Sequence, residues 1–187
     1  ANVYKALGKY DQANKVLEYA LKIYKDLEED DLYYSVLGEM AAIDYYALNW
    51  SRSMQRTLTV IEHLENSENQ RFLHIQKQRL ANLYFSLGWQ QKALPLYRSC
   101  EAYYKDKPED VLNLAYVSIN LGDAYAQTGQ ANKSISRYEN AIRILAQTDQ
   151  HNYLLAKSKL TAAYIQNKQL EKAKLYGAAV FAEQIQA

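Results

Sequence analysis

The sequence of 187 residues has little glycine, proline or cysteine, with six, two and one of each. A β-sandwich of this length would need many more turn-forming residues, so this scarcity favours long helices joined by short turns. The single cysteine, Cys100, excludes an internal disulfide bond. No apolar run reaches the roughly 20 residues that a membrane-spanning helix needs. These absences predict an all-α protein that does not associate with a membrane.

The chain also has almost no net charge. It contains 22 Lys and Arg against 21 Asp and Glu, a formal balance of +1. Binding to the phosphates of a nucleic acid requires a basic face, so nucleic acid is a poor candidate partner. In contrast, 49% of the residues are hydrophobic, including 18 tyrosines. That content is sufficient for a substantial core.

A period close to 40 residues runs through the whole chain. Each period has an apolar segment, a tight turn and a second apolar segment, as in residues 118–145, where apolar residues recur at helical spacing. A small residue closes each turn, and the five are spaced by 40, 40, 41 and 39 residues: Ala13, Ser53, Ala93, Ser134 and Ala173. Such regularity predicts a stack of helical hairpins in which small residues let two helices approach closely.

The pattern predicts nine long helices. Pro108 fits the first turn of one of them, where its missing N–H has no helical partner. Most of the acidic residues at 28–31 belong to a helix start, where the helix dipole favours negative charge. The expected ranges are about 10–28, 31–48, 51–66, 69–87, 90–106, 109–128, 131–147, 150–167 and 170–186.

The residues Leu121, Gly122, Tyr125, Gly129, Tyr138 and Ala141 form a series that resembles the tetratricopeptide repeat. The resemblance extends over essentially all 187 residues and implies a right-handed α-solenoid of helix-turn-helix repeats. The family's repeat has 34 residues, so a period near 40 implies longer helices or connections. Arrays of such long repeats are similar to those of bacterial signalling regulators and scaffolds. The second repeat fits least well, because Met40 and Ala41 stand where the family has Leu-Gly.

We expect a single domain over residues 1–187. Its repeats span about 1–28, 31–66, 69–106, 109–147 and 150–187. The first repeat has only Ala1 to Leu7 before its turn, and the last helix is apolar on more than one side. Since a repeat array covers its apolar ends with a capping element, we expect the chain to be a fragment of a longer protein.

Catalytic chemistry is not expected. His63, His74 and His151 fall at unlike places in their repeats, and no His-x-x-x-His or Cys-x-x-Cys spacing occurs. Cys100 occupies the position of Ala141 in the next repeat, which indicates a small packed residue. We therefore predict no catalytic residue, no metal site, no cofactor and no enzymatic activity.

The tyrosines divide into two groups. Five occupy packing positions of the repeat and should be buried: Tyr84, Tyr97, Tyr125, Tyr138 and Tyr164. Six others form adjacent pairs at 33–34, 45–46 and 103–104. Neighbouring residues of a helix point about 100° apart, so only one member of each pair can be fully buried. The other member could either contact a partner or pack between repeats.

The resemblance implies that the first helix of each repeat lines a concave groove that binds a protein or peptide. The groove-facing positions would be Gly38, Ala42, Tyr45, Gln78, Asn82, Phe85, Ile119, Asp123, Ala126, Ser158, Ala162 and Ile165. Flanking residues that can form hydrogen bonds with a peptide backbone are Arg79, Asn120, Gln127, Lys159 and Gln166.

Some members of the family grip the terminal carboxylate of a peptide with a clamp of basic and amide side chains. Asn82, Asn120 and Lys159 match that clamp, whereas Gln78 and Leu155 replace two of its basic residues. The loss of two cations removes most of the charge-assisted binding. The sequence therefore disfavours this narrower mode.

The resulting prediction is a non-enzymatic scaffold or regulatory domain that binds a protein or peptide. One alternative is a ligand-sensing domain of a bacterial signalling protein or transcriptional regulator. Another is a self-association module that forms a homodimer. We expect a cytoplasmic location, with a periplasmic sensor region as the alternative.

Overall fold

The structure, a computed structural model, describes the backbone of residues 1–186 and the side chains of this range other than those of residues 179, 180 and 182–186. Part of the apolar surface that the sequence predicts for the last helix, at Ala179, Val180, Ala182 and Ile185, lies outside the described side chains. Every regular element in the described range is helical. The helices are α1 (Asn2–Ala6), α2 (Tyr10–Asp26), α3 (Asp30–Tyr46), α4 (Trp50–Leu64), α5 (Gln70–Ser86), α6 (Gln90–Tyr104), η1 (Pro108–Asp110), α7 (Val111–Gln127), α8 (Ala131–Leu145), α9 (Gln150–Gln166) and α10 (Leu170–Gln186).

The nine predicted helices are confirmed, and their ends lie within two residues of the prediction. One difference concerns Pro108. It opens the separate 3-10 turn η1 that leads into α7, since proline has a fixed φ and no N–H to donate. The acidic residues behave as predicted, with Asp30 and Asp31 in the first turn of α3.

The turn inside each repeat needs one residue with a positive φ. Gly8, Gly88 and Gly129 supply it, with φ values of 68°, 78° and 73°. In the turn after α7, the Gln130 N–H donates to the carbonyl of Tyr125 at 2.8 Å, which closes the end of the helix. Leu48 and Lys168 occupy the same position in their repeats with φ values of 61° and 58°. Side chains with a Cβ are disfavoured in this conformation.

We expect Leu48→Gly and Lys168→Gly each to stabilise the protein by about 1 kcal/mol. Both side chains are exposed, so their removal leaves no cavity. The matched control is Gly129→Ala, which places a Cβ in the same conformation and should destabilise the protein by a similar amount. Urea denaturation followed by circular dichroism measures all three. A lower midpoint for both glycine variants would contradict this account of the turns.

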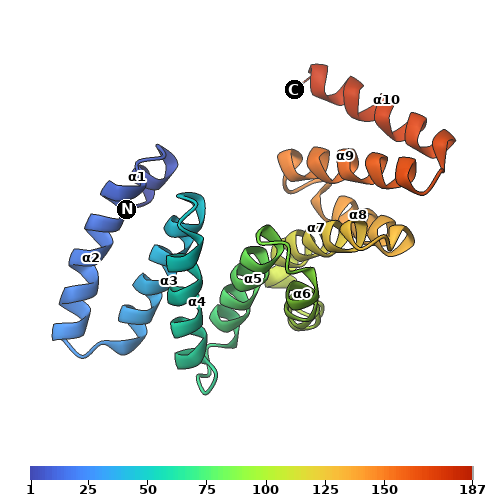
Figure 1. The fold of residues 1–187 in the computed structure, drawn as a ribbon. Coiled ribbons are helices and arrows are strands. Elements are labelled where there is room, and N and C mark those ends of the chain that lie inside the picture. Colours follow the sequence, from blue (N-terminus) through green and yellow to red (C-terminus); the bar gives the residue numbers. More distant parts are fainter. Residues whose placement is uncertain (187) are drawn as a thin grey trace. The chain divides into compact units, whose positions relative to one another are not determined.

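The chain forms two compact units, Ala1–Leu87 and Gly88–Ala187, which we call unit 1 and unit 2. Within each unit, every helix packs against the helices that precede and follow it, as the successive hairpins of Figure 1 show. The predicted close approach at the small residues is confirmed. Ala13, Ser53, Ala93 and Ser134 are fully buried, and Ala173 is 7% exposed.

The core of unit 2 is built from aliphatic and tyrosine side chains. Tyr138 and Tyr164 are each 2% exposed and belong to a cluster that also contains Leu145 and Leu160. Tyr97 and Tyr125 are buried as predicted, whereas Tyr84 is only half-buried. Cys100 is fully buried, which confirms its packing role.

The paired tyrosines follow the helical geometry. Tyr104 is fully buried while Tyr103 is half-buried. Tyr46 is 55% exposed while Tyr45 is half-buried. In no pair are both rings fully buried, as the angle between neighbouring helical residues requires. Each pair is in edge-to-face contact, so intrahelical packing accounts for part of their role.

Candidate functional site: the first-helix faces

The first helices of the repeats in unit 2, α7 and α9, lie next to each other. Helix α9 is covered by α8 and α10 and leaves a single exposed stripe. The stripe repeats at intervals of four and three residues, the spacing of one helix face. Its members are His151, Leu155, Ser158, Ala162 and Ile165. We call these five residues the α9 stripe.

The α9 stripe contains three of the predicted groove positions, Ser158, Ala162 and Ile165. Gln166 lies next to it and is also exposed. Two exposed apolar side chains stand out, with Ile165 55% exposed and Leu155 40% exposed. The sequence analysis did not place Leu155 on this exposed face, because Leu155 was compared only with the clamp. Its three-residue distance from Ser158 was the signal that could have identified it.

Asp123 and Lys159 join α7 to α9. The Lys159 ammonium donates to both carboxylate oxygens of Asp123, at 2.8 and 2.9 Å. The Tyr138 hydroxyl of α8 donates to the same carboxylate at 2.7 Å. The side chains of Asp123 and Lys159 are 22% and 31% exposed. This partly buried cluster therefore connects three helices and forms part of the surface beside the α9 stripe.

Two similar tyrosine–carboxylate bonds support this part of unit 2. Tyr116 donates to Asp149 at 2.8 Å, and Tyr164 donates to Glu139 at 2.9 Å. Burial, together with the adjacent carboxylate, raises the pKa of Tyr138 and Tyr164 well above the ordinary range. These hydroxyls therefore remain protonated donors at neutral pH. The Asp123 carboxylate is held by the buried Tyr138 hydroxyl as well as by the Lys159 ammonium.

The remaining predicted residues of α7 have different environments. Asn120, Asp123 and Ala126 are half-buried, and Gln127 is exposed and accepts a hydrogen bond from Gln90 at 2.6 Å. Ile119 is 5% exposed and belongs to the core cluster of unit 2. The prediction that Ile119 faces the groove is therefore wrong. Its side chain packs in the core with residues of α8 and α9, such as Tyr138 and Leu160.

In unit 1, the corresponding first helices are α3 and α5. Their predicted residues Tyr45, Gln78, Asn82 and Phe85 are half-buried. The Tyr45 hydroxyl lies 3.2 Å from the Ser86 hydroxyl, which links the two helices.

Arg79 has a structural partner in α3. It donates to the Gly38 carbonyl at 2.6 Å and to Gln76 Oε1 at 2.5 Å, and desolvation by burial lowers its pKa. Gly38 and Ala42 are buried, so the prediction that they face a ligand is wrong. The close contact of Gly38 with α5 explains this, because a Cβ there would lie 2.9 Å from the Phe72 ring.

The predicted residues thus form two sets. Tyr45, Gln78, Asn82 and Phe85 lie on the α3 and α5 faces of unit 1. The other set lies on the α7 and α9 faces of unit 2 and contains Asn120, Asp123, Gln127, Ser158, Lys159, Ala162, Ile165 and Gln166. The three histidines do not converge. His63 stacks on Tyr34 with 3.7 Å between ring centroids, His74 bonds to the Gln70 carbonyl, and His151 is exposed on α9.

Within the part of the chain that the structure describes, no three His, Cys, Asp or Glu side chains form a group that could hold a metal ion. Along residues 1–186, no helix combines the length and apolar character required to cross a lipid bilayer.

Comparison with known proteins identifies the repeat. Residues 115–146 match the sequence model of the tetratricopeptide repeat, and this range contains the turn at Gly129 and the packing pair Gly122 and Tyr138. The helical hairpins described above extend the same pattern over the other repeats. The chain is an array of tetratricopeptide-like repeats. No curated protein matches its sequence.

Solved structures share the fold of this array. BtubC from P. vanneervenii aligns with a TM-score of 0.86 and 16% identity, over 98% of this chain and 76% of that one. A putative kinesin light chain repeat protein of Podosopora anserina gives 0.77 and 19%, over 99% and 91%. A Rap protein complexed with competence and sporulation factor gives 0.72 and 19%, over 96% and 52%. At these identities, the likeness concerns the fold alone.

Proposed function

We propose that this array is a protein-interaction scaffold or regulatory domain whose first-helix faces bind a segment of a partner protein. The observation that carries the proposal is the α9 stripe beside the Asp123–Lys159 pair. Exposed apolar side chains next to fixed polar groups suit a partner segment that has an apolar side and a polar backbone. The described residues offer no convergent catalytic group, and the proposed activity is binding.

Ile165 is the residue that we expect to contribute most. It is the most exposed large apolar side chain on the face, and burial of such a side chain contributes about 1.5 to 3 kcal/mol. The Asp123 carboxylate already accepts bonds from Lys159 and Tyr138. Asp123 therefore shapes the surface and orders its neighbours, and a ligand would meet this pair from its exposed side.

We expect Ile165→Glu to abolish capture of the partner without unfolding the protein. Replacing an exposed isoleucine with glutamate changes the free energy of unfolding little. Burying that glutamate against an apolar partner surface, in contrast, is costly. The measurement is affinity capture from a cell extract with quantitative mass spectrometry, using wild-type protein as the reference.

The matched control is Leu58→Glu. Leu58 lies on the second helix α4 and is 43% exposed. Proteins that Ile165→Glu loses and Leu58→Glu retains would support the proposal. Equal capture by wild type and Ile165→Glu, or equal loss with both variants, would contradict it.

The ligand-sensing alternative has one structural observation in its favour. The Rap protein that shares this fold was solved in complex with competence and sporulation factor. An array of hairpins, in which each repeat touches its neighbours, can also transmit a change from one repeat to the next. The same Ile165→Glu experiment separates the two ideas, since a sensor that uses another surface would lose no partner.

A further inference from the structure

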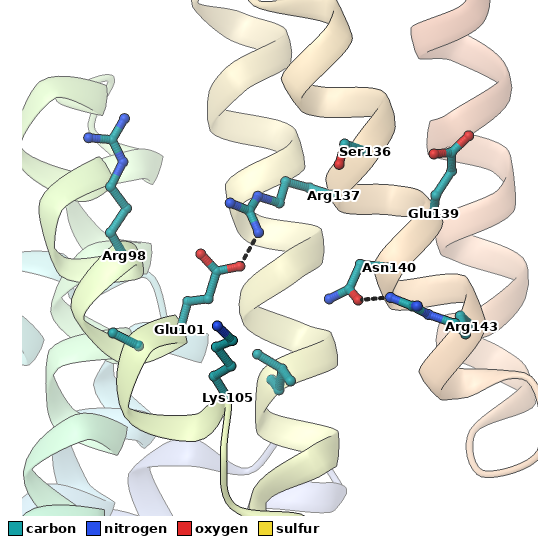
Figure 2. A pocket seen from close by; sticks show the side chains of 10 residues that line it. Arg98, Glu101, Lys105, Ser136, Arg137, Glu139, Asn140 and Arg143 are labelled. Carbon is teal, nitrogen blue, oxygen red and sulfur yellow. Dashed lines mark hydrogen bonds and ion pairs between the residues drawn. The ribbon is translucent and has the colours of Figure 1, made fainter.

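A hollow of about 780 Å³ lies in unit 2 between the second helices α6 and α8, away from the α9 stripe. The start of α7 contributes Leu114 to its wall, and most of the lining is polar or charged. Figure 2 shows Glu101 of α6 and Arg137 of α8 directed toward one another across this space. We call it the α6–α8 hollow. None of the residues proposed above to bind a partner lines it.

The hollow contains more positive than negative charge. Its lining includes four basic residues, Arg98, Lys105, Arg137 and Arg143, and two acidic ones. The whole chain carries a formal charge of only +1, so positive charge is concentrated here relative to the rest of the chain. A concave site lined by one sign of charge attracts ligands of the opposite sign.

Both acidic residues already have partners within the chain. Glu101 forms an ion pair with Arg137 that crosses the hollow from α6 to α8 (Figure 2). Glu139 accepts a hydrogen bond from the Tyr164 hydroxyl at 2.9 Å. The Glu101–Arg137 pair has no net charge, so the three cations Arg98, Lys105 and Arg143 outweigh the remaining carboxylate of Glu139.

Two of these cations, Arg98 and Arg143, each donate one hydrogen bond to another side chain of the protein. Arg98 Nε donates to the Tyr125 hydroxyl at 3.2 Å, and Arg143 Nη2 donates to Asn140 Oδ1 at 2.5 Å. A guanidinium has five N–H donors in a planar fork that matches a carboxylate. These bonds orient the arginines while most of their donors can still serve a ligand. Lys105, at the end of α6, is exposed and lies across the hollow from Arg143.

The size of the hollow indicates the kind of ligand. From Arg98 to Lys105 the rise along α6 is about 10 Å, a distance that roughly three extended residues cover. The polar lining disfavours an apolar small molecule. We propose that the α6–α8 hollow binds a short acidic peptide segment of a partner protein, with its carboxylates on Arg98, Lys105 and Arg143. This inference goes beyond the proposed function, because it concerns a separate surface.

The test uses a tetraglutamate peptide with blocked ends and a fluorescent label, titrated with the full chain at low salt. The neutral tetraglutamine peptide is the ligand control. We expect Lys105→Gln to weaken binding of tetraglutamate about threefold to tenfold, since a charge-assisted contact is lost. Lys22→Gln removes an exposed lysine of α2 outside the hollow and should have no such effect.

A gain of binding provides the sharper result. Glu101→Gln removes a negative charge and releases Arg137, so we expect it to tighten tetraglutamate binding about threefold. Loss of folding cannot produce that outcome. Weaker binding by Glu101→Gln, or equal effects of Lys105→Gln and Lys22→Gln, would overturn the proposal.

Two further arms complete the experiment. Inorganic phosphate that displaces tetraglutamate at equal concentration would show a site for any small anion and would overturn the peptide assignment. Ile165→Glu should leave tetraglutamate binding unchanged, because the α9 stripe is a different surface. Tetraglutamate binding therefore tests the α6–α8 hollow alone, and the partner capture described above tests the α9 stripe alone.

Discussion

Replacing Gly122 with alanine is expected to destabilise the protein by about 2 kcal/mol. A Cβ at this position would lie 2.4 Å from Cε1 of Tyr138 and 2.7 Å from its Cδ1. Tyr138 is 2% exposed and its hydroxyl is bonded to Asp123, so the ring has little room to move. The clash exceeds the gain in helix propensity of about 1 kcal/mol that alanine brings. Thermal and urea denaturation measure the change.

Gly177→Ala is the matched control for this prediction. Gly177 also lies inside a helix, α10, but a Cβ there would meet only Thr161 Cγ2 at 3.4 Å, an ordinary contact. Alanine should therefore stabilise the protein at 177 by up to about 1 kcal/mol. Opposite signs at the two glycines are expected. An increase in stability with Gly122→Ala would show that α7 and α8 do not approach each other as closely as the structure indicates.

The second large effect concerns a buried charge in unit 1. Asp44 of α3 is fully buried, and its carboxylate accepts a 2.6 Å bond from Arg56 Nη1 of α4. Asn14 of α2 donates to the other oxygen at 3.4 Å. Arg56→Met removes the closest and most buried partner of this carboxylate and leaves the exposed Arg52, at 3.7 Å, as its nearest cation. We expect a loss of about 3 kcal/mol in the free energy of unfolding.

Arg52→Met tests whether this loss arises from burial. Arg52 Nε lies 3.7 Å from the same Asp44 carboxylate, but its side chain is 52% exposed. An exposed partner at that distance contributes at most about 1 kcal/mol. The two methionine variants should therefore differ by about 2 kcal/mol in urea denaturation. Equal and small losses would show that solvent reaches Asp44.

The repeat architecture could be predicted from the sequence because it depends on local spacing. The five small residues at a period near 40 identify the close helix contacts, and the glycines at 8, 88 and 129 identify the turns. Leu48 and Lys168 have a positive φ because they occupy the turn position of their repeats, although neither residue type favours that conformation. Helix ends within two residues of the prediction reflect this periodicity.

The binding surface was harder to predict because it depends on contacts between helices that are distant in sequence. The family resemblance implies that Ile119 faces the groove, but the side chain packs in the core with residues of α8 and α9. Asp123 was expected to be open to a ligand and instead accepts bonds from Tyr138 and Lys159. Gly38 was expected on the groove and contacts α5. Packing against other helices buries Gly38 and Ile119, whereas Asp123 is only partly buried and keeps an exposed side.

The α6–α8 hollow gave no signal in the sequence. Arg98, Arg137 and Arg143 are separated by up to 45 residues and stand among mostly neutral neighbours, so no basic run marks them. Only the packing of α6, α7 and α8 places them around one space. Similarly, nothing in the sequence around Asp44 indicates that Asn14 and Arg56 meet it.

The central claim is that a partner protein docks on the first-helix face of α9. The most direct measurement is site-specific photo-cross-linking, with a benzophenone amino acid in place of Ala162 on the α9 stripe or of Leu58 on α4. We expect a covalent adduct with a partner protein from position 162 and none from position 58. An adduct from position 58 with none from position 162 would contradict the assignment of the binding face.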